Sequence, residues 1–206
     1  MRSCESRRFC RVTGEIRRAE RAAQQCGSED AGEKEREMTI AELMEEMIAF
    51  TAKDSGVVHH DVNHFMKVWG FARTIGVEEG LDEKTLFTVE AAAILHDIAC
   101  PLCRRKYGNT MGKYQEEEGE ALAGSLLAET DIPKDIRDRV VYLVAHHHTY
   151  TGVNGIDYQI LLEADYLVNA DESQANRENI QSTGDKIFRT KTGLRILKEL
   201  YGYKAG

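Results

Sequence analysis

The seven histidines of this chain fall into three short clusters. Imidazole binds first-row divalent metals and titrates near neutral pH, so gathered histidines indicate a metal site or acid–base catalysis. The first cluster precedes an apolar helical pattern, the second is a single histidine beside an aspartate, and the third is a triplet. The residues are His59, His60 and His64; His96 with Asp97; and His146, His147 and His148.

Two carboxylates interrupt segments that are otherwise apolar. Asp97 lies in "AAAILHDIACPLC" and Asp165 lies in "LLEADYLV". An ionised carboxylate that is buried without a partner costs several kcal/mol. A basic side chain, a hydrogen-bond network or a metal ion can neutralise it. Carboxylates and imidazoles from several helices are the ligand set of a metal site, but ordinary core histidines and capped or arginine-paired aspartates explain the spacing equally well.

Cationic residues near these positions suggest an anionic ligand. Lys67 follows His64 by three residues, which places both on one helix face. Arg105 and Lys113 lie in a basic stretch after Asp97, together with Arg104 and Lys106. This stretch predicts a phosphate clamp, and a solvated charged loop is the alternative.

Cys100 and Cys103 form a CxxC pair directly after Asp97. Such a pair is typical of a redox motif or of half a zinc site. The chain has no second CxxC and no βαβ pattern around this one, so packing thiols are the preferred interpretation.

The elements that must position these residues are helices. Thr39 and Glu42 form a capping box at the start of the first helix of the core. We expect a second helix over 61–75 with Gly76 as its stop, and a third from Asp82 that Pro101 ends.

The remaining pattern continues as helices joined by polar turns. We expect a polar loop over 104–115, a fourth helix over 115–129, and a fifth from Pro133 through the histidine triplet. A glycine-rich turn then leads to helices at 157–170, 175–190 and 194–202. No alternating strand pattern appears, so the predicted class is all-α.

Composition excludes several classes of function. The 206 residues include 42% hydrophobic and 30% charged residues, with a net charge of −8. An acidic chain is a poor partner for long nucleic acid, and no segment approaches the roughly 20 apolar residues of a membrane span. Five cysteines, an odd number, do not make a secreted disulfide framework, so we expect a cytoplasmic protein.

Residues 1–37 differ from the rest because they contain almost no large apolar residues. We predict a disordered or loosely helical N-terminal extension there, and one helical domain over 38–206.

The order H … HD … HH … D resembles the HD-domain superfamily of metal-dependent phosphohydrolases. The resemblance covers about residues 57–170, and the ending "KIFRTKTGLRILKELYG" is similar to small bacterial HD hydrolases of unassigned substrate. The matching segments are "DVNHFMKVWGFA" with His64, "AILHDIA" with His96 and Asp97, "LVAHHHTYTG", and "LEADYLVN" with Asp165. The resemblance implies a helical bundle similar to those of HD domains and phosphodiesterases.

The resemblance also implies a site and a reaction. A divalent ion (Mn, Fe, Co, Ni, Zn or Mg) would be held by His64, His96, Asp97 and Asp165. The reaction would be hydrolysis of a small phosphoester, such as a nucleotide or related phosphomonoester, by a metal-activated water. Catalysis would use Asp97 to steer the water, His146 or His147 to donate a proton, and Lys67 as a further catalytic residue. The substrate would contact Lys67, Arg105 and Lys113.

One position departs from relatives that bind two metals. Those relatives carry a histidine on the fourth helix where this chain has Gln115. Glu116 or Glu118 is a possible replacement ligand, and a solvated acidic helix face is the alternative. Two other functions remain open: a regulatory module that binds a metal and a nucleotide without turnover, and a diiron oxygenase of HD type.

Overall fold

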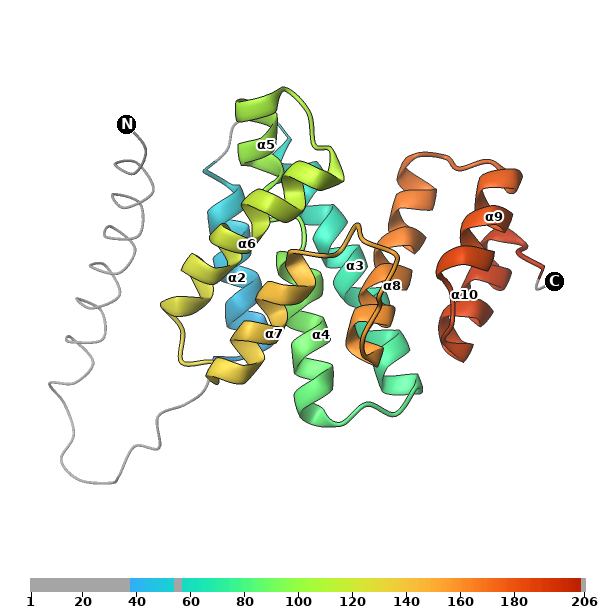
Figure 1. Cartoon of the computed structure of the whole chain (residues 1–206), viewed down its shortest axis with the longest axis horizontal. Helices are drawn as coiled ribbons and strands as arrows, with labels where there is room; N and C mark the ends of the chain where they lie inside the picture. Colours follow the sequence, from blue (N-terminus) through green and yellow to red (C-terminus); the bar gives the residue numbers. More distant parts are fainter. Residues whose placement is uncertain (1–37, 54–56, 205–206) are drawn as a thin grey trace, which may run out of the picture.

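The computed structural model describes residues 38–53 and 57–204, and over this part of the chain it contains helices and no strand (Figure 1). The predicted all-α class is confirmed. The predicted N-terminal extension at 1–37 lies outside the described residues and stays a prediction. The helices are α2 (Ile40–Thr51), α3 (Val58–Glu78), α4 (Glu83–Leu95), α5 (Cys100–Tyr107), α6 (Gly112–Ala128), α7 (Lys134–Val144), α8 (Ile156–Glu172), α9 (Arg177–Ile187) and α10 (Lys191–Tyr201).

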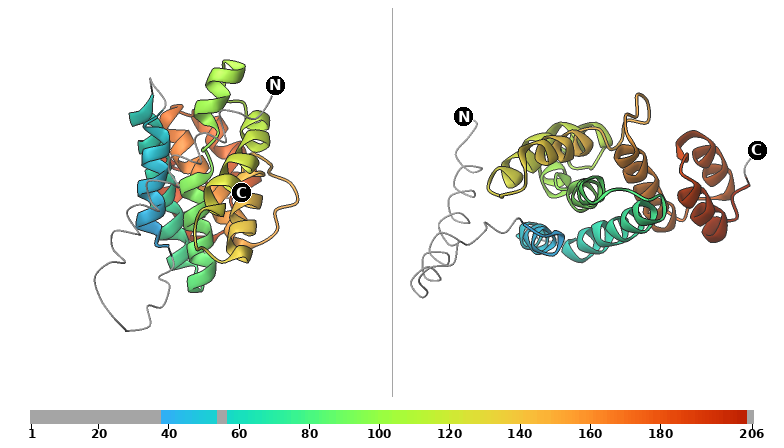
Figure 2. Two further views of the ribbon diagram at one scale, coloured as in Figure 1. Left: turned by 90° about the vertical axis from the view of Figure 1, so that its left-hand side faces the viewer. Right: turned by 90° about the horizontal axis from the view of Figure 1, so that it is seen from below.

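Helix α4 is the centre of the bundle. Its residues from Thr88 to Leu95 are all buried, because a helix that is apolar on every side must be surrounded by others. The end-on view in Figure 2 shows α2 and α3 on one side of α4, and α6 and α7 on the other. Helices α2, α3, α7 and α8 all contact α4. The residues that end α4 therefore lie deep in the molecule.

In contrast to the sequence expectation, one stretch of the described residues, Glu83–Tyr107, is long and apolar enough to cross a membrane by length and composition alone. It contains α4, and 78% of its most apolar window is buried within the bundle. This burial is the pattern of a core helix.

Helix α3 passes through the glycine that was expected to stop it. A Cβ on Gly76 would lie 2.8 Å from the side chain of Leu86 on α4, so this glycine permits close packing of the two helices. The helix ends two residues later at Glu78, and Gly80 follows its end with a φ of +75°. Such a left-handed residue is the usual glycine stop. The prediction chose the wrong glycine.

The chain changes direction between α4 and α5 at the site of the HD doublet. Helix α4 ends at Leu95, and residues 96–99 form a turn. Pro101 was predicted to end a helix, but it lies in the first turn of α5. A proline is tolerated there because the first helical amides have no partner within the helix. The turn presents His96 and Asp97 from the middle of the bundle.

Two further boundaries differ from the expectation. The predicted polar loop over 104–115 is mostly helical, since its start belongs to α5 and its end to α6, which leaves only 108–111 between them. Helix α7 ends at Val144, so the histidine triplet lies in the turn after the helix. Both turns that carry site histidines thus directly follow the C-terminal ends of helices.

Helices α9 and α10 pack beside α8 at the far end of the bundle (Figure 1). Glu163 on α8 is buried there and accepts hydrogen bonds from the backbone amides of Arg189 and Thr190 and from the side chain of Gln159. Its carboxylate thus joins α8 to the start of α10. This role is structural, in contrast to that of Asp165 two residues later.

Candidate metal centre

Three residues from separate elements meet at the buried end of α4. His64 comes from α3, His96 from the turn after α4, and Asp165 from α8. The Nε2 atoms of the two histidines are 3.2 Å apart. Asp165 Oδ1 lies 3.3 Å from His64 Nε2 and 3.5 Å from His96 Nε2. An ion at about 2.0–2.2 Å from three such atoms keeps them roughly 3–3.5 Å apart, so the three donors fit a first-row divalent metal.

Asp97 adjoins this group and is the most accessible of the four predicted ligands. Its Oδ2 lies 3.5 Å from His64 Nε2 and 3.7 Å from His96 Nε2. The side chain is 23% exposed, whereas the side chains of His64 and Asp165 are 6% and 7% exposed. The structure therefore brings all four predicted ligands together, with Asp97 on the side that solvent reaches.

Hydrogen bonds at Nδ1 direct the ring nitrogens of the cluster. His96 Nδ1 lies 2.8 Å from the carbonyl oxygen of Ala93, and His64 Nδ1 lies 2.9 Å from Glu172 Oε2. Both acceptors require a proton on Nδ1, which leaves the Nε2 lone pair for the cluster. This arrangement is the one that metal-binding histidines adopt.

The electrostatics of the group also favour a cation. Burial by itself lowers the pKa of His64, but hydrogen bonding and charge from Asp165, Asp97 and Glu172 raise it to about 9. Burial raises the pKa values of Asp97 and Asp165, yet the surrounding imidazoles hold both well below the usual range. Two ionised carboxylates in this position attract positive charge, and a divalent ion competes with protons for the same nitrogens.

A second group of donors shares Asp97. Its Oδ1 lies 3.6 Å from His147 Nε2, and Asp97, His147 and His148 offer donor atoms within 4.8 Å of one another. The Nε2 atoms of both histidines are buried without a hydrogen-bond partner. An unpaired buried nitrogen is costly, so this group also fits a cation.

His148 belongs to this second group although the sequence did not single it out. Burial and the neighbouring His147 lower its pKa to about 4, so its ring is neutral at pH 7 and its lone pair is available. A Cβ on Gly112 would lie 2.6 Å from the His148 ring, which shows how closely α6 packs against it. The only signal in the sequence was the triplet itself.

The structure separates the two predicted proton donors. His147 is buried beside Asp97, and its Nδ1 lies 2.7 Å from the Val144 carbonyl oxygen. His146 turns the other way: its Nδ1 lies 2.7 Å from the Tyr142 carbonyl oxygen, and its ring stacks on that of Tyr142. His146 belongs to neither donor group of the described residues. A catalytic role for it stays a prediction.

Helix α6 supplies no additional donor to the two groups. Gln115 is buried, donates to the Thr110 carbonyl oxygen and accepts from the Cys100 thiol. Glu116 accepts from the amide of His148, and Glu118 binds Lys106 and Tyr107. Glu116 thus links α6 to the turn that carries His148, and Glu118 links α6 to α5.

Of the predicted substrate-binding cations, Lys67 is connected to the cluster through one intervening residue. Lys67 Nζ lies 2.6 Å from Glu172 Oε1, and Glu172 in turn contacts His64. Arg105 is exposed on α5, and Lys113 is exposed on α6 with its ammonium group 5.9 Å from the ring of Tyr114. The proposed phosphate clamp of Arg105 and Lys113 stays a prediction.

The CxxC cysteines are buried free thiols. Burial raises the pKa of both, and the charge of Asp97 raises them further. A protonated buried thiol is unreactive, in accord with the packing role that the sequence favoured.

Glu172 is the contact that the sequence analysis missed. It lies seven residues after Asp165, two helical turns along the same face of α8. That spacing was visible in the sequence, but an acidic residue near a helix end is commonplace, so nothing distinguished it.

Comparison with known proteins gives a matching family model and two similar solved structures. Residues 61–180, more than half of the chain, match the model of the HD domain family. The fold is similar to the crystal structure of a predicted HD superfamily hydrolase from an uncultured Thermotogales bacterium, with a TM-score of 0.57 and 25% sequence identity over 80% of this chain and 92% of that one. The Lin1889 protein from Listeria innocua matches with a TM-score of 0.48 and 20% identity over 80% of this chain and 91% of that one. No match is found among curated proteins.

Proposed function

The chain belongs to the HD domain family and is a metal-dependent hydrolase of that superfamily, and we propose that it cleaves a small phosphoester. The observation that carries the proposal is the convergence of His64, His96 and Asp165 with Asp97 at their open side. A bound divalent ion lowers the pKa of a coordinated water to about 7 and polarises a phosphoryl oxygen. Mn, Fe, Co, Ni, Zn and Mg are the candidates, since mixed imidazole and carboxylate ligands suit most of them.

Asp97 is the residue best placed to orient the attacking water. It contacts the first donor group through Oδ2 and His147 of the second group through Oδ1. It is also the cluster carboxylate with the greater exposure to solvent. A hydrogen bond from the water to this carboxylate would fix the direction of attack.

His147 has two possible uses in this reaction. With a single ion in the first group, its Nε2 would carry a proton that passes to the leaving group. With a second ion, Asp97, His147 and His148 would supply three ligands, and Asp97 would be shared by both ions. The buried, unpaired Nε2 atoms of His147 and His148 support the second arrangement.

The substrate that we propose is a nucleotide or a related phosphomonoester. The cations proposed to contact its phosphate are Lys67, Arg105 and Lys113. Lys67 is linked to the cluster through Glu172, which contacts His64. The net charge of −8 speaks against long nucleic acid as a partner. We propose a cytoplasmic enzyme that acts without a membrane partner.

A screen of phosphomonoesters and nucleotides tests this function. The full-length protein is stripped of metal, reloaded with Mn²⁺, Co²⁺, Ni²⁺, Mg²⁺ or Fe²⁺, and assayed for phosphate release and oxygen uptake beside His96→Ala. Metal-dependent turnover that His96→Ala abolishes supports hydrolysis. Thermal stabilisation by a nucleotide without turnover would instead indicate a regulatory module, and iron-dependent oxygen uptake would indicate an oxygenase.

A further inference from the structure

The histidines of the cluster are oriented by two different kinds of acceptor. His96 and His147 direct Nδ1 at backbone carbonyl oxygens, at 2.8 and 2.7 Å. Those acceptors lie at the ends of α4 and α7, three residues before each histidine, so they come with the local backbone conformation. His64 instead directs Nδ1 at a side chain, Glu172 Oε2, at 2.9 Å. Its orientation therefore depends on a residue 108 positions away in the chain.

The Glu172 carboxylate is itself held by its second oxygen. Lys67 Nζ donates to Oε1 at 2.6 Å, one helical turn after His64 on α3. The Glu172 side chain is 19% exposed, and that of Lys67 is 42% exposed. The ion pair thus joins α3 to α8 at the edge of the cluster, with its carboxylate turned toward His64.

We propose that Glu172 is a positioning residue of the metal centre, which holds His64 with Nε2 toward Asp165 and Asp97, and that Lys67 serves mainly to hold Glu172. The inference rests on the proposed function, because it assumes that the cluster binds a divalent ion. It assigns Lys67 a task different from the phosphate contact expected from its spacing. Outer partners of this kind commonly change metal affinity by about 10- to 100-fold when they are removed.

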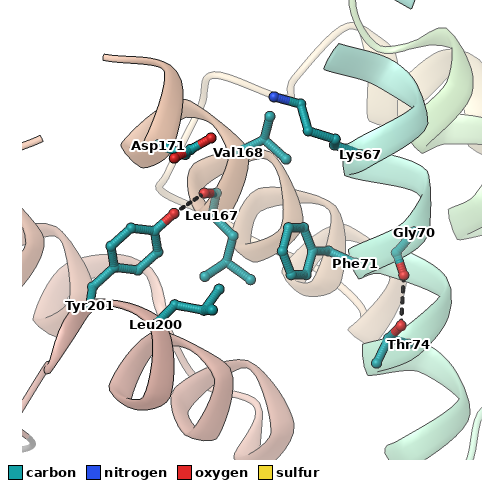
Figure 3. Close-up of a pocket in the computed structure, with 9 residues that line it drawn as sticks. All are labelled: Lys67, Gly70, Phe71, Thr74, Leu167, Val168, Asp171, Leu200 and Tyr201. Atoms are coloured by element: carbon teal, nitrogen blue, oxygen red, sulfur yellow. Dashed lines mark hydrogen bonds between the residues drawn. The ribbon is translucent and has the colours of Figure 1, made fainter. Parts of the chain in front are cut away.

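The neighbouring Asp171 provides a matched control. Figure 3 shows it on α8 beside a groove that α3, α8 and α10 line, with Lys67 on the facing helix. Its side chain makes no hydrogen bond or ion pair with the described residues. Asp171→Asn removes one negative charge next to Glu172 and leaves the bond to His64 in place. The pair of variants separates that bond from the general effect of charge.

The experiment is a calorimetric titration of the metal-free full-length protein with Zn²⁺ alone. We expect Glu172→Ala to weaken Zn²⁺ binding by about 10- to 100-fold. Glu172→Gln should lie between Glu172→Ala and the wild type, because its amide oxygen still accepts from Nδ1–H. Lys67→Met should have a smaller effect than Glu172→Ala, and Asp171→Asn should stay within about twofold of the wild type.

A second readout distinguishes positioning from general support of the fold. In Zn²⁺-loaded protein with ¹⁵N-labelled histidine, the His64 Nδ1–H proton should be hydrogen-bonded and slow to exchange in the wild type. In Glu172→Ala this protection should be lost, while metal-free unfolding should match that of Asp171→Asn. Zn²⁺ affinity in Glu172→Ala equal to that in Asp171→Asn would overturn the inference and leave the proposed function standing. Failure of the wild type to bind Zn²⁺, and Mn²⁺ in a parallel titration, would instead overturn the proposed function.

Discussion

At the scale of single residues, the site depends on which ring nitrogen of each histidine faces the carboxylates. His64 and His96 both present Nε2 to Asp165, because Nδ1–H of each ring donates a hydrogen bond to an acceptor on its other side. The same acceptors prevent the rings from rotating. Both imidazole rings are therefore oriented before a cation binds, which reduces the conformational entropy lost on binding.

His96→Ala is expected to remove both metal binding and hydrolysis. His96 is fully buried at the centre of the first group, and no described neighbour replaces its nitrogen. The loss should exceed the roughly 100-fold upper range for removal of an outer partner. Metal content after dialysis and the rate of phosphate release measure it. His59→Ala, which removes an exposed histidine, is the control and should leave both unchanged.

The set of four ligands came from the family resemblance, and apolar neighbours made three of its members, His96, Asp97 and Asp165, conspicuous in the sequence. Asp97 and Asp165 interrupt buried runs, and His96 sits beside one of them. Glu172 and His148 could not be singled out in this way. One ends a helix among polar residues, and the other is the last of three histidines whose directions depend on a turn.

At the scale of elements, two turns that follow helices bring their histidines and Asp97 to residues inside two other helices, His64 on α3 and Asp165 on α8. The turn after α4 presents His96 and Asp97, and the turn after α7 presents His147 and His148. Tyr158 on α8 secures the second turn, because its hydroxyl lies 2.6 Å from the carbonyl oxygens of both His146 and Thr149. The start of α8 thus fixes the histidine triplet.

Tyr158→Phe should loosen the triplet without emptying the first donor group. Loss of the hydroxyl is expected to lower the free energy of unfolding by about 1 kcal/mol and to reduce phosphate release more than metal content. Denaturant unfolding and metal analysis measure the two effects. Tyr142→Phe is the matched control, since the Tyr142 hydroxyl has no partner among the described residues. Equal behaviour of the two variants would contradict the role given to Tyr158.

The link between α8 and α10 makes a separate prediction about stability. A Cβ on Gly193 would overlap the Glu163 carboxylate and lie 2.7 Å from Thr190 Oγ1. Gly193→Ala should therefore destabilise the fold by about 1–3 kcal/mol, as overpacking does. Gly70→Ala on α3 is the comparison, because a Cβ there meets nothing within 4 Å. It should stabilise the helix by roughly 0.5–1 kcal/mol in the same denaturant assay.

Helix identities were predictable and several helix boundaries were not. Apolar periodicity located α3, α4, α7 and α8 correctly, since each must bury one face or all of its surface. Gly76 and Pro101 were misread because each residue type has two uses. A glycine serves helix contacts as well as helix ends, and a proline suits the first turn of a helix as well as its stop. Tertiary packing decides between these uses.

At the scale of the whole molecule, the cluster joins parts of the chain that are far apart in sequence. His64 and Asp165 are separated by 101 positions, and α3, α4 and α8 pack against one another around them. A cation bound at their meeting point opposes separation of these helices. Metal binding and global stability should therefore be coupled.

Removal of metal should lower the melting temperature. At a free metal concentration 100 times the dissociation constant, binding adds about 2.7 kcal/mol to stability, which corresponds to roughly 5–10 °C for a chain of this size. Scanning calorimetry with a chelator and with added Mn²⁺ measures the difference. His96→Ala serves as the control and should melt at the same temperature in both conditions.

The most direct test of the account is anomalous diffraction from crystals of the full-length protein grown with Mn²⁺. The account predicts a peak at bonding distance from His64 Nε2, His96 Nε2, Asp165 and Asp97. Absence of a peak at these four residues, whether or not one is found elsewhere, would contradict it.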